Sequence, residues 1–239
     1  MSVEGIRKQG LRLAVASAAA VAGLLGAAQG AGAAAITAGE ECCVFVGSPF
    51  TQEAGVSAMI SNPGGSNTAA HNAYSDDLGP DGGPLFYSTL ALPGETRPVR
   101  GTEYLAEGSY GFVCTLHSGM VGTLGVSGGT PTPRPRAVPR IPAQSLATVR
   151  KKGRIAAAVR SPGGSGPVSL SVRSAGRAIG SLRTGQLAAG QSRRVSVTLS
   201  RQGKRLIAKG KSVKIEVRAV AEFGIPARAT RLLRLGGGR

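Results

Sequence analysis

Three residues at intervals of three, Cys114, His117 and Met120, offer a thiolate, an imidazole and a thioether within one short stretch. Soft sulfur donors together with imidazole are the ligands that copper prefers. The chain has one other histidine, His71, which can supply a second imidazole. Taken singly, a cysteine is most often a small buried residue and a methionine fills gaps in a core. Taken together, these four residues predict a copper site.

The three clustered residues belong to a loop between two predicted strands. Before the loop, Tyr110, Phe112 and Cys114 are two positions apart and fall on one face of a strand. After it, Leu124 and Val126 repeat the same spacing. A short loop held at both ends by strands can direct all of its donor atoms to one point.

The run Tyr-x-Phe-x-Cys-x-x-His-x-x-Met-x-Gly-x-Leu-x-Val over residues 110–126, with His71-Asn72 upstream, resembles the cupredoxins, the small blue-copper proteins. The short loop is most similar to that of the amicyanin type. The resemblance implies a Greek-key β-sandwich over residues 36–128 that binds one copper ion. It implies as ligands His71, Cys114, His117 and, as a weak axial ligand, Met120. It further implies that the backbone of Asn72 helps to fix the loop and donates a hydrogen bond to the thiolate.

Residues 1–35 are predicted to be a signal peptide and not part of the fold. A basic start precedes an apolar, alanine-rich run over residues 13–28, and small-x-small patterns end at Ala33 and at Ala35. The apolar run is short for a membrane span. We therefore expect export and cleavage, with no transmembrane span in the mature chain and an extracellular, periplasmic or envelope-associated location.

Two adjacent cysteines, Cys42 and Cys43, need an explanation in an exported chain, because oxidising compartments favour disulfides. They can close a strained ring with each other, or one can pair with another chain. A bridge from either to Cys114 would remove the copper thiolate, and we predict that none forms. A structural role and a redox-sensitive role for the pair both stay open.

Residues 129–143 are predicted to be a linker, and residues 144–239 a second β-sandwich. Five prolines within residues 131–142 favour an extended, semi-rigid spacer. The second half has alternating segments separated by glycine and serine clusters, with the general look of an immunoglobulin or fibronectin domain. Strands are expected at 154–160, 168–173, 194–200 and 213–220, and a short helix or turn at 202–208.

Charge divides sharply between the two halves. Residues 134–239 hold 24 lysines and arginines against two acids, a net charge of +22, whereas residues 36–133 hold two arginines against nine acids, a net charge of −7. A cationic surface attracts nucleic acid, anionic lipid or acidic polysaccharide. Nucleic acid is disfavoured, because Phe223 is the only aromatic residue of this half that can stack on bases. An anionic cell-wall or envelope polymer is the expected partner; the alternative is a surface that only confers solubility.

The leading interpretation is single-electron transfer through one mononuclear copper, with a redox partner protein. A copper carrier or store and a metal-free structural surface module are the alternatives. An enzyme is not expected, because multicopper oxidases and nitrite reductases need further histidines and this chain has two. Hydrolytic triads, zinc patterns and phosphate-binding loops are also missing from the sequence.

Overall fold

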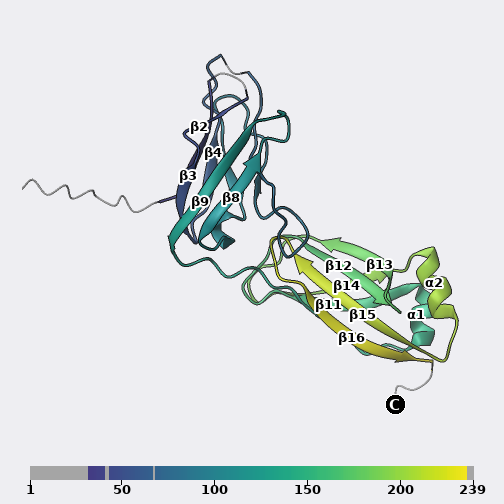
Figure 1. Ribbon diagram of the computed structural model, residues 1–239. Helices are drawn as coiled ribbons and strands as arrows, with labels where there is room; N and C mark the ends of the chain where they lie inside the picture. The colour runs from purple at the N-terminus through teal and green to yellow at the C-terminus, as the bar shows by residue number, and fades with distance from the viewer. Residues whose placement is uncertain (1–31, 41–42, 67, 236–239) are drawn as a thin grey trace, which may run out of the picture.

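Strands far outweigh helices in the computed structural model, which describes residues 32–40, 43–66 and 68–235 and confirms the predicted all-β class (Figure 1). The first sandwich contains β1 (Ala35–Ala38), β2 (Phe45–Val46), β3 (Phe50–Ala54), β4 (Ala58–Ser61), β5 (Tyr74–Ser75), β6 (Tyr87–Ser88), β7 (Thr96–Arg100), β8 (Gly108–Val113) and β9 (Val121–Gly129). These strands form one curled sheet in the order β2-β1-β4-β7-β6-β5-β8-β9-β3. Neighbours are antiparallel except for the pairs β1–β4 and β3–β9, which are parallel.

Phe112 on β8 is the centre of the first core. Its ring meets Phe45 edge-on at a centroid distance of 4.9 Å and lies 6.2 Å from both Phe50 and Phe86. Gly122, its partner on β9, makes room for it, because a β-carbon there would lie 2.4 Å from the Phe112 ring. The strand that leads into the loop of Cys114, His117 and Met120, here called the metal-binding loop after its predicted role, is thus anchored by aromatic packing just before the loop begins.

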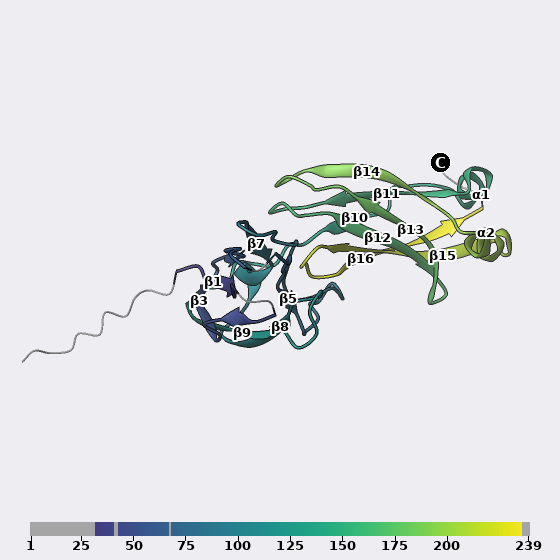
Figure 2. The same cartoon turned by 90° about the horizontal axis from the view of Figure 1, so that it is seen from above.

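The second sandwich consists of two facing sheets with two short helices at one end (Figure 2). One sheet contains β10 (Val138–Arg140), β11 (Arg154–Arg160) and β14 (Ser192–Thr198). The other contains β13 (Arg177–Thr184), β12 (Val168–Ser174), β15 (Ser212–Ala221) and β16 (Ala227–Arg234). The helices are α1 (Leu146–Lys152) and α2 (Arg201–Ala208). The four predicted strands and the predicted helix are present, while α1, β10, β13 and β16 lie outside the predicted set.

Two predicted segment boundaries, that of the linker and that of the signal peptide, differ slightly from the structure. Strand β10 lies within residues 129–143, so the second sandwich begins inside the segment predicted as linker. At the N-terminal side, β1 starts at Ala35, and the buried Ala34 accepts a hydrogen bond from the Met59 amide at 2.9 Å. The fold therefore includes the last residues of the predicted signal peptide; most of that peptide, residues 1–31, lies outside the described residues.

A proline-rich spacer was expected to keep the domains apart, but the turn after β15 inserts into the end of the first sandwich. Phe223, 5% exposed, lies 5.6 Å from the Tyr87 ring and 6.1 Å from the Tyr104 ring, measured between centroids. Its amide donates to Asp81 at 2.8 Å, and its carbonyl accepts from Arg134 at 3.0 Å. The two sandwiches are thus joined by packed rings and hydrogen bonds as well as by the linker.

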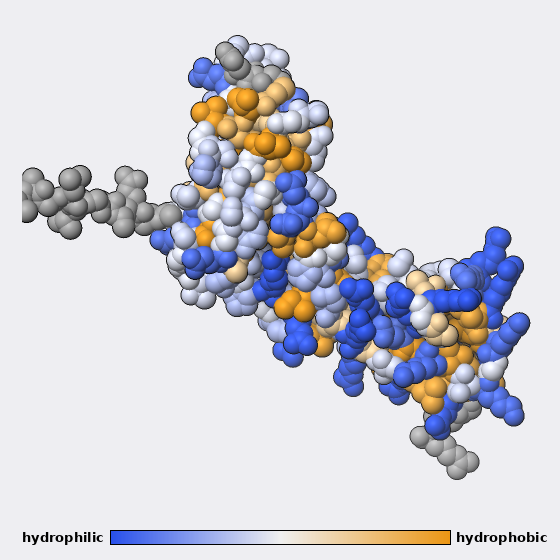
Figure 3. Space-filling model, viewed as in Figure 1, coloured by the Kyte–Doolittle hydropathy of each residue, from blue (hydrophilic) through white to orange (hydrophobic). Residues whose placement is uncertain are grey.

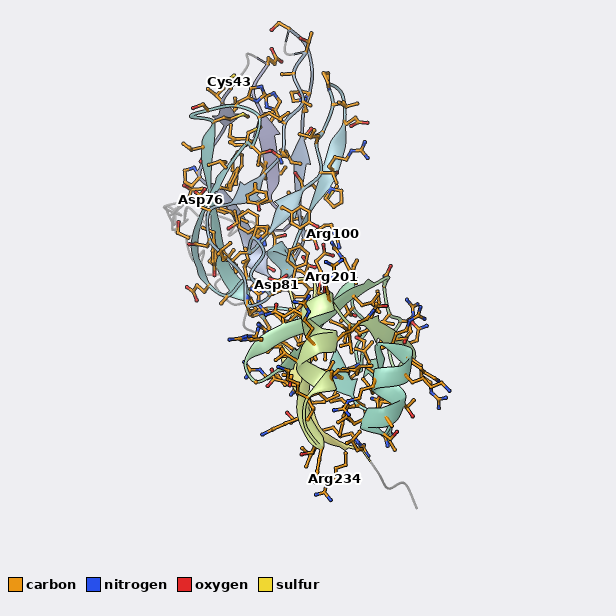
Figure 4. All side chains as sticks on the ribbon, turned by 90° about the vertical axis from the view of Figure 1, so that its right-hand side faces the viewer. Cys43, Asp76, Asp81, Arg100, Arg201 and Arg234 are labelled. Atoms are coloured by element: carbon orange, nitrogen blue, oxygen red, sulfur yellow. The ribbon has the colours of Figure 1, made fainter. Side chains whose placement is uncertain are left out.

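An ion pair flanks this contact. Glu222 accepts hydrogen bonds from the Tyr87 hydroxyl at 2.5 Å and from the Arg100 guanidinium. Asp81 and Arg100 both lie at the junction of the two domains in Figure 4. Burial and this carboxylate together raise the pKa of Tyr87, so its hydroxyl stays a donor.

No helix within the described ranges has both the length and the apolar character that crossing a membrane requires.

Candidate metal centre

The loop between β8 and β9 carries three of the four predicted ligands. Cys114 follows the last residue of β8, and Met120 precedes the first residue of β9. The Cys114 amide donates to the Met120 carbonyl at 3.0 Å, which closes the loop at its neck. Inside it, the His117 amide donates to the Cys114 carbonyl at 3.4 Å and the Met120 amide to the His117 carbonyl at 3.2 Å. Two successive turns of this kind repeat every three residues, which accounts for the spacing seen in the sequence.

His71 reaches the same place from a different part of the chain. Its backbone pairs with that of Ala91 through hydrogen bonds of 3.0 Å and 2.7 Å, and His71 is fully buried. The buried Asn62 side chain donates to the carbonyls of Ala69 at 2.8 Å and Ala91 at 3.0 Å, and so fixes both segments of this bridge. The turn cluster before His71 therefore positions the histidine as well as reversing the chain.

The two histidines and the cysteine converge. The Cys114 Sγ lies 3.4 Å from Nδ1 of His117 and 3.9 Å from Nδ1 of His71, and the two imidazole centroids are 4.7 Å apart. One ligand atom from each of the three residues lies within 4.8 Å of the others. Ligand atoms bonded to one ion at about 2.0–2.3 Å lie roughly 3.5 Å from each other. The donor set and its spacing therefore fit a single soft or borderline metal ion.

Met120, the fourth predicted ligand, is buried in the core of the first domain. It is 1% exposed and belongs to the same apolar cluster as Cys114 and Phe112. A thioether there is shielded from water, as suits a weak soft ligand. The structure thus places all four predicted ligands on two adjoining segments at one end of the first sandwich.

Asn72 joins these two segments through its side chain. Its Oδ1 accepts hydrogen bonds from the Thr115 amide at 2.9 Å and from the Thr115 hydroxyl at 3.2 Å. Thr115, next to the cysteine, has no signal in the sequence that marks it for this role. The resemblance implied instead a hydrogen bond from the Asn72 backbone to the thiolate. Among the described residues, the hydrogen bonds between Asn72 and the loop are those that its side chain accepts from Thr115.

Cys114 is not used up in a disulfide, and the environment of His71 disfavours its charged form. Cys114 is a free, buried cysteine, as predicted, and Cys43 is disulfide-bonded; Cys42 lies outside the described residues. Burial, and then the nearby His117 imidazole, lowers the pKa of His71 below its ordinary value. A neutral imidazole has a lone pair for a metal. This site therefore favours a neutral His71 over an imidazolium.

Apolar side chains surround the accessible edge of the site. His117 is partly exposed; Leu116 beside it is 54% exposed, and Leu90 and Leu92, which flank the Ala91 partner of His71, are 41% and 53% exposed. Figure 3 shows apolar surface on the upper part of the first domain. Strand β9 runs from the metal-binding loop to the linker over nine residues, or about 30 Å. The candidate metal centre thus lies at the end of the molecule opposite the second domain (Figure 1).

Comparison with known proteins gives likenesses of fold. No family model matches the chain, and no curated protein matches it. Two solved structures of amicyanin variants, one oxidised and one reduced, are both 17% identical over 40% of this chain and 83% of theirs, with TM-scores of 0.32 and 0.33. A DUF3823 family protein from Parabacteroides merdae is 14% identical over 85% of this chain and 98% of its own, with a TM-score of 0.28. These likenesses are distant, and the assignment of a metal to the first domain depends on the site described above.

Proposed function

We propose that this chain is an exported protein that transfers single electrons through one mononuclear copper centre in its first domain. One observation carries the proposal: a free, buried cysteine sulfur with an imidazole Nδ1 of His117 at 3.4 Å and of His71 at 3.9 Å. His71, Cys114 and His117 would hold the ion, with Met120 as the weak fourth ligand. Bound copper would supply a Cu(I)/Cu(II) couple.

In this proposal the protein holds the ligands in place and leaves the site accessible to a redox partner. Loop closure between Cys114 and Met120, and the Asn72–Thr115 bonds, fix the donor atoms before any metal arrives. A site fixed in this way needs little rearrangement between the two oxidation states. The exposed leucines beside the ligand segments, Leu90, Leu92 and Leu116, offer apolar surface for close contact with a redox partner protein.

Copper titration of the mature protein tests this proposal. We expect one equivalent of Cu(II) to produce an intense visible band, and voltammetry to show a reversible one-electron couple. A copper carrier or store would bind the ion without rapid, reversible reduction. Absence of any bound copper would leave the metal-free structural module and overturn the proposal.

We propose as a second function that the basic domain docks the protein to an anionic cell-wall or envelope polymer. The charge split of −7 against +22 favours it, because only the second half attracts a polyanion. Attraction by exposed charges fades as the Debye length falls from about 10 Å at 0.1 M salt to about 3 Å at 1 M. The protein should sediment with anionic cell-wall material at low salt and be released near 1 M; no sedimentation at low salt would contradict docking.

A further inference from the structure

The outer face of the three-stranded sheet in the second domain has a groove bordered by arginines. Arg140 of β10, Arg160 of β11 and Arg194 of β14 line it, and the small side chains of Ala156 and Ala158 form part of its floor. We call this feature the arginine groove. It faces away from the four-stranded sheet and from the core between the two sheets, because its arginines and alanines alternate with buried residues along β10 and β11 and with less exposed residues along β14.

Strand register explains the shape of the groove. Arg140 pairs with Ala158, and Ala158 pairs with Arg194, so two arginines flank one alanine in a single row. Strands lie about 4.8 Å apart, which puts the α-carbons of these arginines roughly 10 Å apart. Arg160 stands two residues further along β11, about 7 Å away. Two long side chains on either side of a methyl group leave a channel between them.

The three guanidinium groups have no partner among the described residues. All three arginines are exposed, and neither an ion pair nor a hydrogen bond to another described residue is made by their side chains. Other arginines of this domain do have structural partners. Arg150 donates to the Ile207 and Gly210 carbonyls at 2.7 Å and 2.6 Å, and Arg231 donates to the Ile141 carbonyl at 3.1 Å. The arginine groove is therefore not explained by the packing of the domain.

No carboxylate offsets this charge locally. Strands β10, β11 and β14 contain no acidic residue. The only two acids of residues 134–239, Glu216 and Glu222, belong to β15 and the turn after it, in the other sheet, and Glu222 is paired with Arg100. Three like charges held near each other repel, and an anion between them relieves that repulsion. Guanidinium forks bind carboxylate and phosphate groups bidentately, which a single anionic chain can satisfy in sequence.

We propose that the arginine groove is where the second domain binds a linear anionic polysaccharide, a step that rests on the docking function proposed above. The alanine floor offers an apolar surface for the carbon–hydrogen faces of sugar rings, while the arginines at its sides bind the acidic groups. Single-stranded nucleic acid is the weaker match, because it needs aromatic rings for stacking. Phe223, the one aromatic residue of this half, is occupied in the domain contact.

Two triple variants of the full chain with equal net charge test the site. The first, Arg140→Gln with Arg160→Gln and Arg194→Gln, removes the charges of the arginine groove. The matched control, Arg177→Gln with Arg201→Gln and Arg234→Gln, removes three exposed arginines that lie outside it. Binding to polygalacturonate is measured by calorimetry at low salt, with uncharged dextran as the neutral polymer. The thermal midpoint and the visible copper band of each variant verify that the protein is folded and loaded.

We expect the groove variant to bind polygalacturonate about tenfold more weakly than the wild type, with the control within about threefold. Equal weakening of both variants would overturn the groove and leave docking by the overall field. No binding by the wild type would overturn docking as well. The visible copper band reports separately on whether the first domain binds copper, and voltammetry on whether it transfers electrons. Tighter, groove-dependent binding of single-stranded DNA would overturn the choice of a polysaccharide.

Discussion

The side-chain amide of Asn72 connects the two halves of the candidate metal centre, since His71 comes from one segment and the other ligands come from the β8–β9 loop. The thiolate and the thioether have different roles within that loop. Cys114 would be the strong ligand and the source of colour, whereas Met120 would tune the potential from the core. The following substitutions separate these roles.

Replacing Cys114 by Ser should abolish the intense visible band, because a hydroxyl cannot replace a thiolate as donor. Met120→Leu should keep the band and change the reduction potential, because only the weak axial ligand is lost. Absorption spectra and voltammetry of the copper-loaded variants provide the measurement. A Cys114→Ser protein with the original band would show that the site is misassigned, and an unchanged spectrum for His71→Ala would place the second imidazole elsewhere.

Replacing Asn72 by Ala should lower the free energy of unfolding of the metal-free protein by about 1–3 kcal/mol, because it leaves the Thr115 amide without its acceptor. Copper affinity should fall about 10–100-fold, as is usual when a residue that supports a ligand is removed. Thr115→Val is the matched control: it removes only the hydroxyl bond at 3.2 Å and keeps the amide bond at 2.9 Å. Urea unfolding measures the free energy of unfolding, and competitive titration measures the copper affinity. Equal effects of the two substitutions would contradict the role of the hydrogen bond from the Thr115 backbone amide.

The ligands could be predicted from the sequence, but their support could not. Cys114, His117 and Met120 repeat at the spacing of the turns that hold them, and His71 is the one remaining histidine. The bond between Asn72 and Thr115 joins residues 43 positions apart, and no local pattern records such a pairing. The resemblance pointed to Asn72 but to a different atom.

At the scale of elements, β8 and β9 determine where the metal-binding loop begins and ends. Gly122, two residues beyond Met120, pairs with Phe112, whose ring occupies the space that a side chain at Gly122 would need. The packing of Phe112 against Gly122 thus helps to fix the start of β9, where the loop ends.

Gly122→Ala should destabilise the protein by about 1–3 kcal/mol, because the added methyl group overpacks the Phe112 ring. Gly125→Ala, on the same strand, should have a much smaller effect, because a β-carbon there meets nothing closer than 3.6 Å. Thermal or urea unfolding of the two variants makes the comparison. Equal stability of the two would mean that the ring moves aside without cost.

Secondary structure could be predicted where alternation is strong and missed where it is weak. Strand β11 has a regular exposed–buried alternation and matches its prediction at both ends, whereas the edge strand β16 has three exposed residues in succession, Thr230 to Leu232, which break the alternation. Helix α1 is seven residues long, too short for a clear apolar period. The structure shows how its ends are capped: the Ser145 side chain accepts a hydrogen bond from the Thr148 amide, and Gly153 ends the helix in a left-handed conformation.

The boundary of the predicted signal peptide shows the same limit at the start of the fold. Both small-x-small patterns satisfy a cleavage site by composition, but Ala35 pairs with Met59 in β1. Cleavage after Ala33 leaves this pairing whole, and cleavage after Ala35 would remove it. Pairing with a distant strand therefore favours Ala33, which composition does not distinguish.

At the scale of the whole molecule, the contact between the two domains lies far from the candidate metal centre. The candidate metal centre is at one end of the first sandwich, and the turn that carries Phe223 inserts at the other. Charge composition predicted two domains with different partners. It did not predict their contact, because a single aromatic residue after a strand has no periodic signature until the partner rings of Tyr87 and Tyr104 are known.

Phe223→Ala should weaken the contact between the domains and leave the metal centre unchanged. Removing a buried ring from its partners costs about 3–5 kcal/mol in a core, and here the loss falls on the interface. The radius of gyration from small-angle X-ray scattering should rise as the domains separate about the proline-rich linker, and a protease should cut that linker faster. Ile225→Ala, whose side chain is 49% exposed in the same turn, is the matched control and should change neither. The visible copper band should stay the same in both variants, since the ligands lie at the far end of β9. Unchanged scattering in Phe223→Ala would mean that the pairing of Glu222 with Arg100 and the linker hydrogen bonds hold the domains together without the ring.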